Sequence, residues 1–187
     1  MELCVRNLSK SYDGRAVLEN VSFTAPVGLT RIAGNSGIGK TTLLRILLGL
    51  ETPDGGEVAP KNLRWAAVFQ EDRLLEGLDA AGNLRFALGA AYDDSQAKTL
   101  LEALGLGDVG GKKVCDYSGG MKRRLALARA LLAPCDALAL DEPFTGLDRA
   151  SREAALGAVL RAAEEKIVLL AAHEELDLPA RCGEITL

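Results

Sequence analysis

Apolar positions along the chain follow two patterns that alternate. Short apolar runs of strand character occupy residues 29–33, 65–69, 137–140 and 167–171. Apolar residues at helical spacing mark residues 40–48, 118–132 and 149–165. In the second of these segments, one helix face collects Met121, Leu125, Ala128 and Leu132. Strands that alternate with helices predict an α/β fold with a mainly parallel sheet covered on both faces.

The two ends of the chain predict further strands. Residues 2–8 and 17–24 have strand character and flank a turn at Asp13 and Gly14, which predicts an antiparallel β edge on the parallel core. Residues 184–187 predict a final edge strand. The Pro-Asp-Gly-Gly sequence at residues 53–56 predicts a turn.

The middle of the chain differs in composition. From about residue 79 to residue 105 it is rich in Ala and Leu at helical spacing, and the sequence Asp93, Asp94 and Ser95 favours a helix N-cap. We interpret residues 1–187 as a single domain. In this interpretation, residues 1–72 and 134–187 form the sheet core, and approximately residues 73–133 form an inserted helical subdomain.

Composition and charge argue against several classes of protein. The 187 residues are 48% hydrophobic and carry a net charge of −4, whereas nucleic-acid-binding proteins usually carry a basic excess, so no nucleic-acid partner is expected. The four cysteines form no C-x-x-C pair, which argues against a zinc site. The first residues do not resemble a signal peptide, and no apolar run approaches the ~20 residues of a membrane span. We therefore expect a cytoplasmic protein with no direct membrane insertion.

One segment matches a phosphate-binding loop in full. Between a predicted strand and a predicted helix, the pattern G-x-x-x-x-G-K-[ST] is met by Gly34, Asn35, Ser36, Gly37, Ile38, Gly39, Lys40 and Thr41. The glycines let backbone N–H groups turn inward, and the N-terminus of the next helix favours anionic phosphate. We expect Lys40 to reach the β- and γ-phosphates, Thr41 to ligate Mg²⁺ and Thr42 to contact the nucleotide. The alternative is a flexible Gly-rich turn.

Two carboxylates follow the apolar run at residues 137–140. Asp141 and Glu142 would be costly at a buried strand end unless a cation or polar ligand balanced them. Beside a phosphate loop, they predict Asp141 as a ligand of Mg²⁺ and Glu142 as the base that polarises the attacking water. A helix cap is the alternative interpretation of the same pair.

A glycine-containing motif precedes these carboxylates and opens a predicted helix. It comprises Tyr117, Ser118, Gly119, Gly120 and Met121, and it resembles the signature motif, usually written L-S-G-G-Q, of the ATP-binding cassette (ABC) ATPases. The first and last residues depart from that pattern. Ser118 acting only as an N-cap after a glycine turn is the alternative.

Further residues stand in the order that the ABC family has, and the resemblance covers nearly the whole chain. By resemblance, Tyr12 stacks on adenine, and Gln70 approaches Mg²⁺ and the attacking water. Asp148 resembles the loop residue that faces a second subunit, and His173 resembles the histidine that contacts the γ-phosphate.

The residues after the motif depart from the family pattern. Lys122, Arg123 and Arg124 lack the glutamine often found there, and three positive charges in the first turns of a helix oppose its dipole. Two interpretations remain open at this point. These side chains form a solvated face, or they attract the nucleotide held by a partner subunit.

The resemblance implies a P-loop NTPase fold that binds ATP and Mg²⁺, with catalytic residues Lys40, Gln70, Glu142 and His173. It also implies a second ABC ATPase subunit, expected in a homodimer, whose Ser118, Gly119 and Gly120 complete the site, and a transmembrane permease. Such a chain is peripheral at the cytoplasmic face of the cell membrane. Residues 70–75 resemble those of nitrate, sulfonate or taurine importers. A soluble, non-transport ABC ATPase is the main alternative; a P-loop kinase is disfavoured by the motif at Ser118.

Overall fold

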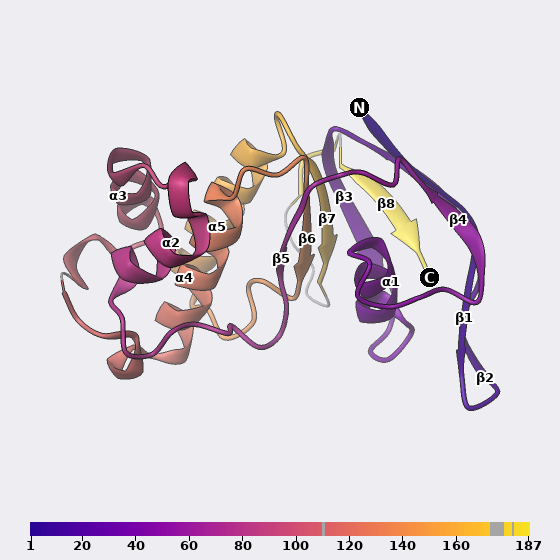
Figure 1. Ribbon diagram of the computed structural model, residues 1–187, viewed down its shortest axis with the longest axis horizontal. Helices are drawn as coiled ribbons and strands as arrows, with labels where there is room; N and C mark the ends of the chain where they lie inside the picture. Colours follow the sequence, from indigo (N-terminus) through magenta and orange to yellow (C-terminus); the bar gives the residue numbers. More distant parts are fainter. Residues whose placement is uncertain (110, 173–177, 181) are drawn as a thin grey trace.

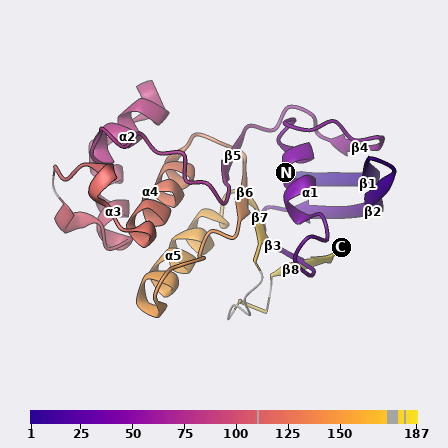
Figure 2. The same cartoon turned by 90° about the horizontal axis from the view of Figure 1, so that it is seen from below.

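The computed structural model describes residues 1–109, 111–172, 178–180 and 182–187, which form two β-sheets and five α-helices. Figures 1 and 2 show a three-stranded sheet at one end, a five-stranded sheet in the middle and the helices α2, α3 and α4 together at the other end. The α-helices are α1 (Lys40–Leu47), α2 (Ala80–Leu88), α3 (Asp94–Ala103), α4 (Gly119–Leu132) and α5 (Arg149–Ala162). Short 3-10 helices are η1 (Gly89–Ala91), η2 (Gly107–Val109) and η3 (Val114–Asp116).

The three-stranded sheet is antiparallel, in the order β2-β1-β4. Its strands are β1 (Glu2–Tyr12), β2 (Arg15–Pro26) and β4 (Gly55–Ala59). The turn between β1 and β2 uses Asp13 at φ 49° and Gly14 at φ 77°, and Tyr12 pairs with Arg15 across it. The predicted antiparallel edge and its turn are confirmed, with both strands longer than expected.

The turn predicted at residues 53–56 is wrong in its second half. Gly55 and Gly56 belong to β4, which pairs with β1. Gly56 has a φ of 89°, and a Cβ there would lie 2.5 Å from the carbonyl oxygens of Arg6 and Asn7. The glycine therefore permits a close approach of two strands, a role that looks like a turn in the sequence.

The five-stranded sheet is parallel throughout, in the order β5-β6-β7-β3-β8. Its strands are β3 (Gly28–Ala33), β5 (Trp65–Val68), β6 (Ala137–Asp141), β7 (Ile167–Ala171) and β8 (Gly183–Thr186). Every residue of β6 and β7 is buried, as expected of strands covered on both faces. The predicted parallel sheet and its final edge strand are confirmed.

Two apolar clusters cover opposite faces of this sheet. Leu138 and Leu140 of β6 point into a cluster that includes residues of α2 to α5, whereas Ala137 and Ala139 point into a cluster with α1 and the strands β1 and β2. The alternation follows from the two-residue period of a strand. The sheet thus holds the helical end and the antiparallel sheet on its two sides.

Side-chain caps start four of the helices. Asp79, Asp93, Ser118 and Asp148 accept hydrogen bonds from backbone N–H groups three residues later, which satisfies amides that a helix leaves unpaired. The cap at Asp93 confirms the sequence prediction. Among the described residues, no helix combines the length and apolarity needed to cross a membrane.

Candidate functional site

The phosphate loop joins β3 to α1 and depends on its glycines. A Cβ on Gly34 would lie 2.8 Å from Ile38 Cγ2, and one on Gly39 would lie 2.9 Å from the carbonyl oxygen of Val17. Gly39 also has a φ of 114° and starts α1 with no side-chain cap. The first N–H groups of α1 are therefore left for a ligand with negative charge.

Lys40 is the charged side chain of this loop. Only 5% of it is exposed, and its Nζ donates to the carbonyl oxygens of Gly34 at 2.6 Å and Asn35 at 3.0 Å. Burial lowers the pKa of the ammonium, while the carboxylates of Glu142 and Asp141 oppose that shift. A buried cation whose hydrogen bonds among the described residues go to two carbonyl oxygens suits an incoming anion.

The carboxyl end of β6 lies directly beside the loop. Thr41 Oγ1 donates to Asp141 Oδ2 at 2.6 Å, so the two predicted Mg²⁺ ligands are in contact. Asp141 is 1% exposed, and burial raises the pKa of its carboxyl despite the opposing effect of the Thr41 hydrogen bond. A buried carboxylate paired with a hydroxyl is a fitting donor set for a hard divalent cation.

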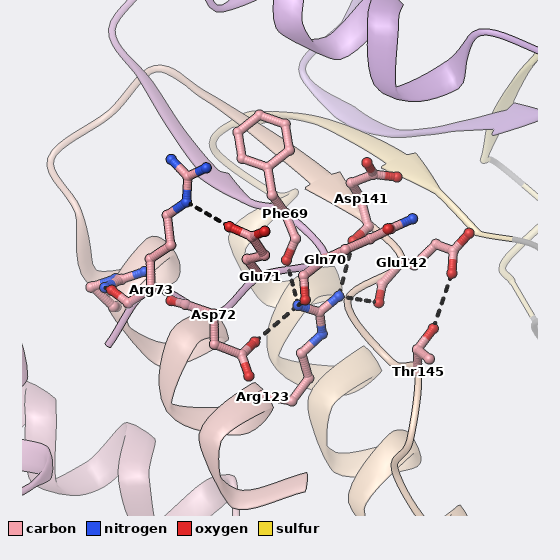
Figure 3. Close-up of polar contacts among 10 residues, drawn as sticks. Phe69, Gln70, Glu71, Asp72, Arg73, Arg123, Asp141, Glu142 and Thr145 are labelled. Atoms are coloured by element: carbon pink, nitrogen blue, oxygen red, sulfur yellow. Dashed lines mark hydrogen bonds and ion pairs between the residues drawn. The ribbon is translucent and has the colours of Figure 1, made fainter. Parts of the chain in front are cut away.

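Glu142 follows in a left-handed backbone conformation, with φ 50°. Its N–H donates to the carbonyl oxygen of Ala171 at 2.8 Å, and Thr145 Oγ1 donates to its Oε2 at 3.3 Å (Figure 3). Non-glycine residues in this region are strained, and strain of this kind gathers at functional sites. The conformation separates the directions of the Asp141 and Glu142 side chains at the strand end.

A cavity of about 310 Å³ brings most of the predicted residues together. It is lined by Tyr12, Val17, Ser36, Gly37, Gly39, Lys40, Thr41, Thr42, Gln70, Asp141 and Glu142. Two other cavities, of about 420 and 340 Å³, are lined largely by apolar residues, and although the first also has Glu51, Glu57 and Lys61 in its lining, neither is lined by a phosphate loop. Polar chemistry, not volume, distinguishes the site.

Tyr12 lies at the edge of this cavity, at the end of β1. Its ring is 40% exposed, and Lys10 Nζ lies 5.2 Å from the ring centroid. Lys10 is fixed by Glu51 Oε1 at 3.1 Å and Asp54 Oδ1 at 3.4 Å. The ring is thus held in place and remains available for stacking.

The residues of the signature motif lie elsewhere. Ser118 Oγ accepts a hydrogen bond from the N–H of Met121 at 3.3 Å, so Ser118 is the N-cap of α4, and its role as a signature residue stays a prediction. Ser118 and Gly119 are exposed and do not line the cavity. Asp148 likewise caps α5, accepting from Ser151 N at 2.8 Å. These residues are not brought to the cavity within one chain.

Sequence reasoning missed the role of Arg123. It is 5% exposed, and its guanidinium binds the carbonyl oxygens of Phe69, Gln70, Asp141 and Glu142 together with the Asp72 carboxylate (Figure 3). Its neighbours are bound within the chain too. Lys122 pairs with Glu76 at 2.7 Å, and Arg124 donates to Leu104 O at 2.8 Å.

The solvated-face interpretation of this basic triplet is therefore wrong for Arg123, and attraction to the nucleotide of a partner subunit stays a prediction. The physical reason is that α4 is buried on most of its sides, between the sheet and the neighbouring helices, so Arg123 and Arg124 donate to backbone carbonyls, whereas Lys122 pairs with the exposed Glu76 carboxylate. The missing glutamine after the motif was the one signal in the sequence. His173 lies outside the described residues.

Comparisons with known proteins agree with this geometry. The family model described as ABC transporter matches residues 18–145. The aliphatic sulfonates import ATP-binding protein SsuB 1 of Paracoccus denitrificans is 36% identical, over 92% of this chain and 73% of its own length. The protein of the same name from Agrobacterium fabrum is 43% identical, over 79% of this chain and 55% of its own length. This chain thus spans between about half and three-quarters of these relatives.

Solved structures show the same fold. A putative ABC transporter ATP-binding protein from Pyrococcus furiosus aligns with a TM-score of 0.87 and 26% identity, covering 100% of this chain and 98% of its own. A bacterial Atm1-family ABC exporter with ATP bound aligns with a TM-score of 0.79 at 22% identity.

The P-loop NTPase fold and the ABC-type ATPase class predicted from the motifs are confirmed by these matches. The assignment of roles to individual site residues stays a prediction. With a family match over more than half of its residues and relatives above 30% identity, this chain belongs to the ABC transporter family as one of its ATP-binding proteins.

Proposed function

We propose that this chain binds MgATP in the 310 Å³ cavity, hydrolyses it, and uses the cycle to power import through an ABC transporter. The observation that carries the proposal is the meeting of Lys40, the Thr41–Asp141 pair and Glu142 around one cavity. The names of the relatives support import, and they favour transport over the soluble alternative. The aliphatic sulfonates in the names of these relatives suggest small organic anions as the class of transported cargo.

The residues present fit ATP and Mg²⁺. The loop glycines leave a cradle that a Cβ would fill, and Asp141 is a buried carboxylate whose pKa is raised by burial, so its charged form would be stabilised by a cation. Thr41, Asp141 and Gln70 would hold Mg²⁺, and the loop from Gly34 to Thr42 would hold the phosphates. When bound, Mg²⁺ neutralises charge on the phosphates and orients them.

The chain itself supplies positioning and proton transfer. Lys40 exchanges its carbonyl partners for phosphate oxygens, and Tyr12 stacks on adenine. Glu142 accepts a proton from the attacking water. The hydrogen bond that Thr145 donates to the Glu142 carboxylate orients that carboxylate. By resemblance, His173 adds a contact to the γ-phosphate. Hydrolysis then proceeds by in-line attack, in which charge stabilisation supplies most of the rate.

A second subunit completes the proposed site. Ser118, Gly119 and Gly120 stand apart from the cavity of their own chain, so they are free to face the nucleotide of a partner, expected to be an identical chain. A Cβ on Gly120 would be 3.5 Å from Gly146 O, an ordinary contact. Gly120→Ala should therefore leave ATP binding by the monomer intact and still lower hydrolysis.

Mixing subunits tests this arrangement directly. In the proposed arrangement, a homodimer of Gly120→Ala chains or of Lys40→Ala chains has two defective sites, whereas a mixed dimer has one site in which both halves are intact. ATP hydrolysis that reappears on mixing supports the two-subunit site. If mixing gives no more than the average of the two variants, the arrangement is wrong.

A transmembrane permease is the second proposed partner, at the cytoplasmic face of the membrane. Leu75 and Leu78 are each 39% exposed in the segment after Gln70, whereas Leu74 packs against the core. Asn83 fixes the backbone of Leu75, donating to its carbonyl oxygen at 3.0 Å and accepting from its N–H at 2.8 Å. An ordered segment with exposed apolar side chains is suited to docking.

The docking test uses this contrast. Leu75→Asp with Leu78→Asp should leave folding and ATP binding unchanged but prevent assembly with the permease. Leu74→Asp is the matched control and should lower thermal stability, because it places a charge against the core. If the variant with Leu75→Asp and Leu78→Asp also aggregates, the docking surface lies elsewhere.

The proposed function itself is tested with the purified chain. We expect Mg²⁺-dependent release of phosphate from ATP, and its loss in Lys40→Ala. Tyr12→Ala should weaken ATP and GTP binding alike, by about 1–3 kcal/mol, because stacking accepts either purine. Hydrolysis that survives Lys40→Ala would overturn the proposal.

A further inference from the structure

Arg123 joins two strand ends through one side chain. Its Nη1 donates to the carbonyl oxygens of Phe69 and Gln70 and to Asp72 Oδ1, the last at 3.0 Å. Its Nη2 donates to the carbonyl oxygens of Asp141 at 3.1 Å and Glu142 at 2.6 Å. Figure 3 shows the guanidinium between the segment after β5 and the end of β6.

The two strand ends carry the residues that face the proposed water. The strands β5 and β6 are neighbours, with Val68 paired to Leu140, and they lead into Gln70 and Glu142. Arg123 reaches both from a third element, α4. It therefore binds the main chain of Gln70 and Glu142, and leaves their side chains for the cavity.

The backbone of Glu142 has an unfavourable conformation that its neighbours must stabilise. Its φ of 50° is costly for a residue with a Cβ, and such conformations persist where the surroundings constrain them. The N–H of Glu142 is bound to Ala171 O, and its carbonyl oxygen is bound by Arg123. Hydrogen bonds thus fix the peptide groups on both sides of the left-handed residue.

The chemistry of arginine suits this task. A guanidinium is planar and carries five N–H donors in a fixed fork, whereas a glutamine amide offers two donors on one nitrogen. Five acceptors on two separate strand ends exceed what glutamine could bind. The Asp72 carboxylate, 22% exposed, balances the buried positive charge.

We propose that Arg123 is a positioning residue for ATP hydrolysis: it holds the carbonyls at both strand ends and thereby sets the spacing of Gln70 and Glu142 across the cavity. The inference rests on the proposed function. It assigns to Arg123 its main effect on the chemical step, because Arg123 touches neither the phosphate loop nor Tyr12 and binds only the main chain of Gln70 and Asp141 at the proposed Mg²⁺ site.

Arg129 provides a matched control on the same helix. Its guanidinium donates to Asp72 O and Arg73 O, both at 2.8 Å, so within the described part of the chain its hydrogen bonds hold the segment after β5 and not the end of β6. Both arginines bind the segment after β5, so an effect that comes from loosening this segment should appear in variants of either arginine. An effect on Glu142 should appear only when Arg123 is changed.

The first measurement is steady-state kinetics of Arg123→Gln, Arg123→Lys and Arg129→Gln. We expect kcat of Arg123→Gln to fall by about tenfold to a hundredfold, since small displacements of catalytic groups have effects of that size. Its KM and its affinity for a non-hydrolysable ATP analogue should stay within about twofold. Arg123→Lys, which keeps the charge, should recover part of kcat, and Arg129→Gln should stay close to the parent.

The second measurement needs no activity. Hydrogen exchange of the nucleotide-free chain should be faster in Arg123→Gln at residues 69–73 and also at 142–145, and in Arg129→Gln only at 69–73. If Arg123→Gln does not fold, Arg123→Lys serves for both measurements, with a smaller effect in the same segments.

The outcomes separate this inference from the proposed function. A parent chain that does not hydrolyse ATP contradicts the proposed function, and hydrogen exchange alone then decides whether Arg123 holds both strand ends. An active parent with unchanged kcat in Arg123→Gln overturns the inference. Equal exchange at residues 142–145 in the Arg123 and Arg129 variants overturns it too.

Discussion

An aspartate lies at each end of strand β6, and the pKa values of the two carboxyls are shifted in opposite directions. Before the strand, Asp136 accepts from Arg64 Nη2 at 2.8 Å, Nε at 3.0 Å and the backbone N at 2.9 Å, and the Arg64 guanidinium lowers the pKa of the carboxyl to about 2. At the other end, burial raises the pKa of Asp141 although Thr41, Arg123 and Lys40 oppose the shift.

The difference separates a structural carboxylate from a functional one. The charge of Asp136 is balanced by groups that fold with it, so this end of the strand is complete in the chain alone. The charge of Asp141 is only partly balanced, so this end gains most when a cation arrives. Functional sites keep such groups at some cost in stability.

The largest expected effect lies at the functional end. Glu142→Gln should lower the rate of ATP hydrolysis by at least about a hundredfold, since general-base catalysis contributes that much, while ATP binding persists. Binding is measured by calorimetry and turnover by phosphate release. The variant should also dimerise with ATP in sedimentation, because it cannot complete the cycle. Turnover near that of the parent would remove Glu142 as the base.

Asp141→Asn tests the balance of charge itself. The factor by which Mg²⁺ raises ATP affinity should then be at least about tenfold smaller than in the parent. The reason is that loss of a charged ligand has a larger effect than loss of a group that only orients a ligand. A carboxyl whose pKa is raised by folding destabilises the fold at pH values above its unfolded pKa, so at pH 7 the melting temperature should hold or rise.

The comparison for Asp141→Asn is made with and without a chelator. In the parent, chelation should weaken ATP binding strongly, and in the variant it should change little. A variant that retains the full response to Mg²⁺, or that melts well below the parent, would show that Asp141 is balanced by the fold as Asp136 is.

The smallest effect is expected at the structural end. The pKa of Asp136 is depressed by folding, from 3.8 to about 2, so its contribution to stability is complete above pH 3.8 and is lost as the pH falls through 2. Asp136→Asn should therefore be less stable than the parent at pH 7 and approach it in acid. Arg64 is 67% exposed, so the effect is modest and weakens with salt.

Chemical denaturation at a series of pH values measures this difference. ATP binding at pH 7 should be unchanged, which distinguishes this end of the strand from the other. A stability gap between parent and variant that is constant with pH would contradict the assignment of the depressed pKa to the Arg64 pair.

What the sequence could predict depended on how local each feature is. The phosphate loop and the Asp141–Glu142 pair are contiguous, so their residue types and order imply their geometry. Strand character was visible in the runs at β6 and β7, which are buried throughout. The order of the strands has no such local signal and came from the structure.

The features that the sequence did not predict depend on distant partners. Arg123 binds groups that lie 18 to 54 residues away, so apart from the missing glutamine nothing beside it in the chain distinguishes it from an exposed lysine or arginine. Gly55 and Gly56 resembled a turn because the strand that they approach, β1, begins near the start of the chain. Both cases required knowledge of the tertiary neighbours.

The placing of the helical end between neighbouring strands has a consequence for folding. Strands β5 and β6 pair directly, with Trp65 opposite Ala137, although residues 69–136 separate them. Pairing across so long a connection is slow, yet each doubling of its length adds only about 0.6 kcal/mol to the entropy of closing it. Trp65 is the only tryptophan, so its fluorescence can time the closure of this edge. An insertion that lengthens the helical end should then slow the pairing of β5 with β6 strongly, while it lowers the stability of the folded sheet only slightly.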